Sequence, residues 1–162
     1  MNKRKKYTPK PSAAQTALAN VAYKLKNNKL TMEDTYDVMI ISQHLFWVQA
    51  ASKDMGWKLT SLKYLNSVKN SLKKMLLLIE SQCYYDEDGS ARANPDMIVK
   101  LHPKTRDKIL YFIIKIYNPT LNLWSNLKPS KMAKLRAEAR QQLDFFILLH
   151  CPRVGNFLYW YY

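Results

Sequence analysis

Glycine is the residue type that most restricts what this chain can fold into, because only three of its 162 residues are glycine. They are Gly56, Gly89 and Gly155, which lie far apart in the sequence. Tight β-hairpins and phosphate-binding loops need glycine where the backbone takes a positive φ or approaches a ligand closely. Three isolated glycines cannot form the G-x-G-x-x-G or Walker A motifs of nucleotide-binding proteins. Helices need little glycine, so the count favours an all-α fold.

Capping residues and the spacing of apolar residues predict four long helices. Ser12 and Gln15 have the spacing of a capping box at the start of the first helix. Gly56 is expected to end the second helix in the left-handed conformation. Ser130 is the expected N-cap of the last helix, which Pro152 is expected to stop. The predicted ranges are 12–28, 31–55, about 59–82 and 130–150.

The segment 97–117 is compatible with two secondary structures. The isoleucine and aromatic content of Ile109–Tyr117 suits a β-strand, with which Met97–Leu101 could pair as a short hairpin. The spacing of the apolar residues suits one face of a helix equally well, and the helical neighbours favour that alternative. Pro95 is a further position at which a short helix could begin.

The predicted elements are expected to form one domain. With 162 residues, of which 48% are hydrophobic, the chain is long enough to bury a core. We therefore expect a single helical bundle of five or six helices over residues 12–162. Residues 1–11 offer nothing to bury and are expected to form a flexible, disordered basic arm.

The sequence also indicates where the protein resides. The longest apolar runs are far shorter than the roughly 20 residues of a membrane-spanning helix, so no membrane span is expected. Two cysteines are too few for a disulfide scaffold or a four-ligand zinc site. A reducing compartment, the cytoplasm, is therefore expected.

The charge of the chain is large and unevenly distributed. Its formal net charge is +14, from 26 Lys and Arg against 12 Asp and Glu. Stability does not require such an excess, because like charges repel within a compact state. Residues 1–30 hold eight basic and no acidic residues, and residues 100–162 hold eleven basic and three acidic ones. Such segregation is typical of a surface that binds a polyanion, although a solvated basic face would also produce it.

The basic residues of the last predicted helix give the most specific functional indication. Lys128, Lys131 and Lys134 crowd the start of that helix, where the macrodipole already disfavours positive charge. Arg136 and Arg140 follow at a mildly repulsive i,i+4 spacing. Unpaired N–H groups and lysines at a helix start together form an anion site. We therefore expect a phosphate there; a carboxylate of a partner protein or a purely solvated surface would fit the same residues.

These residues are expected to share nucleic-acid binding with the arm and with the polar side of the third helix. The candidate contacts are Lys3, Arg4, Lys5, Lys6 and Lys10 in the arm, Lys128, Lys131, Lys134, Arg136 and Arg140 in the last helix, and Lys69, Lys73 and Lys74 as secondary contacts. Contacts to phosphates position DNA or RNA without reading its sequence.

The residues around Gly56 also have features of a helix-turn-helix motif. Ser52, a small residue, stands four positions before the glycine, and Leu62 and Leu65 fall where a second helix must face inward. The major groove of DNA could then be reached by the polar residues Lys58, Thr60, Ser61, Lys63, Tyr64 and Ser67. A plain helical hairpin with a glycine cap would show the same pattern.

No set of residues in the sequence forms a recognisable catalytic or metal site. Asp86–Gly89 resembles part of an EF-hand loop but lacks carboxylates at its first and last ligand positions. Glu33, Asp37 and His44 lie along one helical stripe, but the Glu-x-x-His pair of helical di-metal sites is absent.

The cysteines are not expected to be catalytic. His150 and Cys151 are neighbours in sequence, but adjacent helical residues point about 100° apart and cannot pair as base and nucleophile. No base is placed by sequence to activate Cys83 either. We therefore expect no enzymatic activity, no cofactor and no metal.

The leading interpretation is a non-enzymatic protein that binds nucleic acid through phosphates. The alternative is a protein-interaction module that grips an acidic protein surface, either an assembly subunit or an inhibitor of a host nucleic-acid enzyme. The Lys-, Asn- and Tyr-rich, Arg-poor composition is compatible with the AT-rich genome of a phage or mobile element. The aromatic C-terminal residues 157–162 could pack on the core, dock on another protein or stack on bases.

Overall fold

The computed structural model describes residues 12–56, 61–117, 120 and 127–159. The predicted basic arm, with Lys3, Arg4, Lys5, Lys6 and Lys10, lies outside the described residues, as does the end of the C-terminal aromatic segment.

Six α-helices account for most of the described chain. They are α1 (Ala13–Lys26), α2 (Thr35–Met55), α3 (Leu62–Gln82), α4 (Pro103–Tyr111), α6 (Pro129–His150) and α7 (Pro152–Tyr159). A 3-10 turn, η1 (Met32–Asp34), leads into α2, and a π-helical stretch, η2 (Phe112–Tyr117), extends α4. The strands are β1 (Tyr84–Tyr85) and β2 (Ala91–Arg92), paired antiparallel. The predicted all-α bundle is confirmed.

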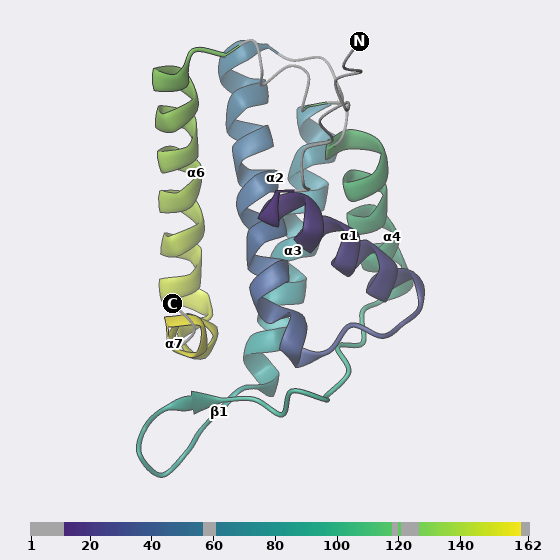
Figure 1. Cartoon of the computed structure of the whole chain (residues 1–162), viewed down its shortest axis with the longest axis vertical. Helices are drawn as coiled ribbons and strands as arrows, with labels where there is room; N and C mark the ends of the chain where they lie inside the picture. The colour runs from purple at the N-terminus through teal and green to yellow at the C-terminus, as the bar shows by residue number, and fades with distance from the viewer. Residues whose placement is uncertain (1–11, 57–60, 118–119, 121–126, 160–162) are drawn as a thin grey trace, which may run out of the picture.

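Helix α2 lies in the middle of the bundle, with α6 along one flank, α1 and α4 on the other, and α3 beside it (Figure 1). Its apolar residues cover most of its circumference, and eleven of its 21 residues are buried. A helix that is apolar nearly all round needs neighbours on every side, so the sequence of α2 accounts for its central position. One continuous core runs from Leu18 in α1 to Leu158 in α7.

The helix ends follow local chemistry. Ser12 Oγ accepts a hydrogen bond from Gln15 N at 3.1 Å and Gln15 Oε1 accepts one from Ser12 N, which confirms the capping box. Gly56 ends α2 at φ 65°, as expected. The prediction that Ser130 caps the last helix is wrong. That helix begins at Pro129, with Lys128 at the N-cap position, because proline lacks the N–H that the first helical position leaves unpaired.

The segment 97–117 is helical from Pro103 onward, so the predicted alternative of a hairpin there is wrong. His102 Nδ1 accepts a hydrogen bond from Lys104 N at 3.2 Å and so caps α4. The prediction of a helix from Pro95 is also wrong, because this stretch pairs with the segment before α2. The Pro95 carbonyl accepts a hydrogen bond from Glu33 N at 3.2 Å, and the Met97 carbonyl accepts one from Met32 N at 3.0 Å.

The acidic stretch at Asp86 closes the hairpin that does form, between β1 and β2. Asp86 Oδ1 accepts a hydrogen bond from Ser90 N at 3.1 Å, and Asp86 Oδ2 lies 2.7 Å from Arg92 Nε. Gly89 takes φ 83° in the turn. Asn156 Oδ1 accepts from Ala91 N at 3.2 Å, which links the hairpin to α7.

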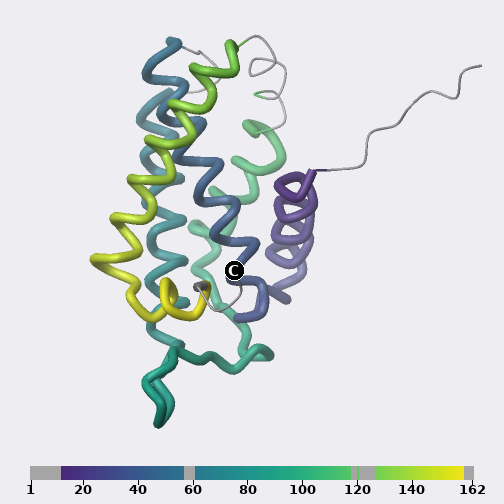
Figure 2. Tube along the Cα trace, turned by 60° about the vertical axis from the view of Figure 1, so that its left-hand side comes forward, coloured from purple at the N-terminus to yellow at the C-terminus, as the bar shows by residue number. Residues whose placement is uncertain are grey.

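Helices α2 and α3 run antiparallel, side by side (Figures 1 and 2). Gln49 donates to Asn66 across the pair, and Lys69 lies over Phe46 one turn further along. The two helices of a helix-turn-helix cross at a steep angle, so the region around Gly56 is a plain helical hairpin. Residues 57–60 of the connection lie outside the described chain.

None of the helices in the described ranges carries a stretch long and apolar enough to cross a bilayer.

Candidate nucleic-acid interface

Three lysines gather where α2, α3 and α6 meet, and we call Lys53, Lys69 and Lys73 the lysine cluster. Lys69 Nζ lies 4.4 Å from the ring centre of Phe46 on α2, and Lys73 Nζ lies 5.1 Å from that of Phe146 on α6. Lys53, near the end of α2, is close enough to Lys69 for its charge to lower the pKa of that lysine. An ammonium group over an aromatic face gains favourable electrostatic energy, so both rings hold their lysines in place.

Lys69 is the member of the lysine cluster that the other two charges repel. The pKa of Lys69 lies below its ordinary value, first because of burial and then because of the nearby positive charges of Lys73 and Lys53. Within the described part of the chain, none of the three forms an ion pair with a carboxylate. An anion bound over the cluster would relieve this repulsion.

The basic residues of α6, by contrast, mostly have partners within the chain. Lys131 Nζ lies 2.5 Å from Asp54 Oδ2 at the end of α2. Arg140 Nε lies 3.2 Å from both carboxylate oxygens of Asp144, one turn further along α6.

Arg136 also has an internal contact, because its guanidinium carbon lies 4.2 Å from the ring centre of Trp47. Lys74, Lys128 and Lys134 are exposed and form no ion pair with any described residue. Lys128 supplies the N-cap position of α6 through its backbone only.

The structure thus brings Lys69 and Lys73 together, while the predicted residues of α6 are distributed over several contacts. Sequence reasoning missed Lys53 altogether. Its position two helical turns after Phe46, combined with an antiparallel α2–α3 hairpin, was the available signal. The predicted residue Lys74 lies next to Lys73 and points to solvent.

The stripe of Glu33, Asp37 and His44 does not converge into a metal site. Asp37 Oδ2 accepts a hydrogen bond from Asn20 Nδ2 at 2.7 Å, whereas His44 Nδ1 lies 3.2 Å from the hydroxyl of Tyr117. Burial, helped by the charge of Arg136, lowers the pKa of His44 to about 4. No group of three metal-ligating side chains occurs in the part of the chain that the structure describes.

Both cysteines are buried. Burial, followed by the charge of Glu80, raises the pKa of Cys83 to about 11 and that of Cys151 to about 12. Thiols with such pKa values are protonated at neutral pH and are poor nucleophiles.

Comparison with protein-family models, with curated proteins and with solved structures finds no match to this chain.

Proposed function

We propose that this protein binds nucleic acid through its phosphates, without enzymatic activity, and that the lysine cluster is the central contact. The observation that carries the proposal is that Lys69 and Lys73 lie one turn apart on α3, with the charge of Lys53 close enough to act on Lys69, and that none of the three has a carboxylate partner among the described residues. Like charges held together destabilise the folded state, so a bound polyanion is the simplest source of compensation.

The surroundings of the cluster favour phosphates over bases. The Phe46 and Phe146 rings are covered by ammonium groups, so they are not available as a stacking platform for bases. Lys69 and Lys73 lie one helical turn apart, about 6 Å along the axis, so their long side chains can contact neighbouring phosphates. Such contacts carry no sequence information, and we expect little sequence preference.

The other predicted residues extend this surface in the proposal. The additional exposed cations are Lys74 on α3, Lys134 on α6 and Lys128 at the N-cap position of α6. The basic arm, with five Lys and Arg residues among its first ten, would add contacts to the same polyanion.

The test is fluorescence anisotropy with labelled duplex DNA, single-stranded DNA and RNA over a series of salt concentrations. Changing Lys53, Lys69 and Lys73 together to Gln removes three phosphate contacts. The slope of log K against log [salt] for duplex DNA should then become shallower by about 2 to 3 units, at about 0.9 per contact.

A matched control removes three charges elsewhere. Lys100, Lys104 and Lys115 are exposed, and α4, which holds Lys104, lies on the opposite flank from α6 (Figure 1). The corresponding triple Gln variant should change the slope by less than one contact. Equal slopes for both variants, or no salt-dependent binding of any nucleic acid, would refute the proposal. In that case, capture of an acidic protein that only the cluster variant abolishes would identify a protein interface instead.

A further inference from the structure

The C-terminal half of α6 presents an apolar ridge to solvent. Phe145, Leu148 and Leu149 are 63%, 73% and 57% exposed, and their i, i+3, i+4 spacing puts them on one face of the helix. Leu148 is the most exposed large apolar side chain among the described residues. A contiguous exposed apolar patch of this kind is a candidate interaction surface.

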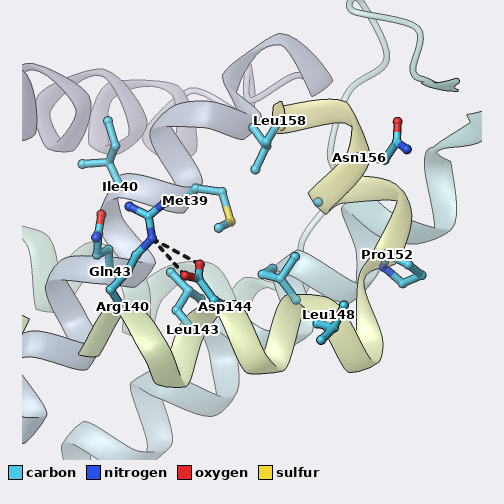
Figure 3. A pocket seen from close by; sticks show the side chains of 12 residues that line it. Met39, Ile40, Gln43, Arg140, Leu143, Asp144, Leu148, Pro152, Asn156 and Leu158 are labelled. Carbon is cyan, nitrogen blue, oxygen red and sulfur yellow. Dashed lines mark hydrogen bonds and ion pairs between the residues drawn. The ribbon is translucent and has the colours of Figure 1, made fainter. Parts of the chain in front are cut away.

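A pocket lies directly beside this ridge, between α2, α6 and α7 (Figure 3). Its volume is about 300 Å³, and its apolar lining includes Met39 and Ile40 of α2, Leu143 and Ile147 of α6, and Leu158 of α7. Leu148 belongs both to the ridge and to the pocket wall. The volume is at the lower limit of small-molecule sites, so it suits inserted side chains better than a large ligand.

Close packing of α7 on α6 forms one wall of this pocket. Gly155 lies against Ile147, whose Cγ2 would be only 3.1 Å from a Cβ atom added at the glycine. Glu80 on α3 accepts hydrogen bonds from the first backbone N–H groups of α7 and so holds this helix in position. The pocket is therefore a fixed feature of the packed bundle.

The charge around the pocket is balanced, unlike the charge of the chain as a whole. Arg140 and Asp144 lie at its rim and pair with each other, as the dashed lines in Figure 3 show. Nucleic acid would therefore find no unpaired cation among the lining residues of this pocket. Two copies of a chain with net charge +14 repel each other, and this repulsion is least where they meet at a surface without unpaired charge.

We infer that this face binds a second copy of the same chain, with the apolar ridge of each protomer seated in or against the pocket of the other. A two-fold contact requires one surface to carry both complementary parts, and here ridge and pocket adjoin on the same helix. The pair Arg140–Asp144 can also exchange partners across such a contact, because each copy supplies both charges. This inference does not depend on the proposed nucleic-acid binding.

The dimer should be weak. Three side chains and a pocket rim offer less than the roughly 800 Å² per partner of a standard interface. We therefore expect half-dimerisation at protein concentrations on the order of tens of micromolar, and a fully monomeric protein in the nanomolar range.

The test is sedimentation equilibrium of the full chain after nuclease treatment, in high salt, where bridging polyanions are released and net-charge repulsion is screened. The average mass should rise from 19.1 kDa toward twice that value as the concentration increases. Leu148→Asp should shift the dissociation constant upward by at least tenfold, because it places a charge in the centre of the ridge.

Tyr23→Asp is the matched control, since Tyr23 is 58% exposed on α1, which lies on the other side of the bundle from α6 (Figure 2). It adds the same charge and should leave the mass curve unchanged. A constant monomer mass up to millimolar concentration overturns the inference and indicates that a segment of the same chain or another protein covers the ridge. Equal effects of the two variants also overturn it. The Leu148→Asp variant should keep its salt-dependent nucleic-acid binding, and the triple lysine variant should still dimerise. A failure of one proposal can therefore be distinguished from a failure of the other.

Discussion

The buried carboxylate of Glu80 is expected to be the most important single polar group for the stability of the C-terminal part of the bundle. Its Oε2 accepts a hydrogen bond from Val154 N at 2.8 Å, and its Oε1 accepts from Arg153 N at 3.0 Å and from Arg153 Nε at 3.1 Å. Helix α7 begins at Pro152, so these two backbone N–H groups belong to its first turn and have no acceptor within that helix. Glu80 therefore caps α7 from a distant position in the sequence.

The magnitude follows from these three hydrogen bonds. A hydrogen bond to a charged group contributes about 1.5–3 kcal/mol, and Glu80→Ala removes two from backbone groups. The Arg153 side chain is 37% exposed, so we add little for its ion pair. In the Glu80→Ala variant no carboxylate has to be desolvated on folding, which offsets part of the lost stability. We therefore expect Glu80→Ala to lower the free energy of unfolding by about 3 kcal/mol and Glu80→Gln, which keeps one oxygen acceptor, by about 1.5 kcal/mol.

Urea unfolding followed by circular dichroism measures both values. Asp144→Ala serves as control, because its ion pair with Arg140 is exposed at both partners and should contribute about 0.5 kcal/mol. Hydrogen exchange at the amides of Arg153 and Val154 should accelerate in Glu80→Ala before global unfolding. A Glu80→Ala variant within 0.5 kcal/mol of the original protein would show that the capping argument is wrong.

Three further predictions concern other buried or constrained groups. His44 has a pKa of about 4 when folded and 6.5 when free, so protons favour the unfolded state between these values. The free energy of unfolding should therefore fall as the pH drops from 6.5 to 4. In the His44→Gln variant, the fall measured by urea unfolding should be smaller. Cys83 and Cys151 should react with a thiol reagent at pH 7 only after denaturant is added, since both pKa values are raised far above neutrality; rapid labelling of the native protein would contradict this. Gly56→Ala should lower the unfolding free energy by about 1 kcal/mol through backbone strain alone, because no atom lies within 4 Å of the added Cβ; a neutral result in thermal or urea unfolding would refute it.

The parts of the fold that depend on residues close together in the sequence could be predicted from the sequence alone. The capping box of Ser12 and the left-handed Gly56 are local, and the apolar circumference of α2 already indicated a central helix. The pairing of residues 95–99 with the segment before α2 could not be predicted, because it joins backbone groups more than sixty positions apart. The same applies to Glu80, whose role as a cap depends on α7 packing near the end of α3.

The positions of the cations that lack a carboxylate partner could not be predicted from the sequence either. Spacing within α6 indicated repulsion between Arg136 and Arg140, and hence a bound phosphate at that helix. In the folded chain, that repulsion is largely offset by Trp47 beneath Arg136 and Asp144 beside Arg140. Among the described residues, repulsion between lysines lowers the pKa of Lys69, and the charges that cause it come from its own helix and from α2. Only the tertiary structure shows which cations already have partners. This is why we propose the anion site at the junction of α2, α3 and α6, where Lys53, Lys69 and Lys73 have no carboxylate partner among the described residues.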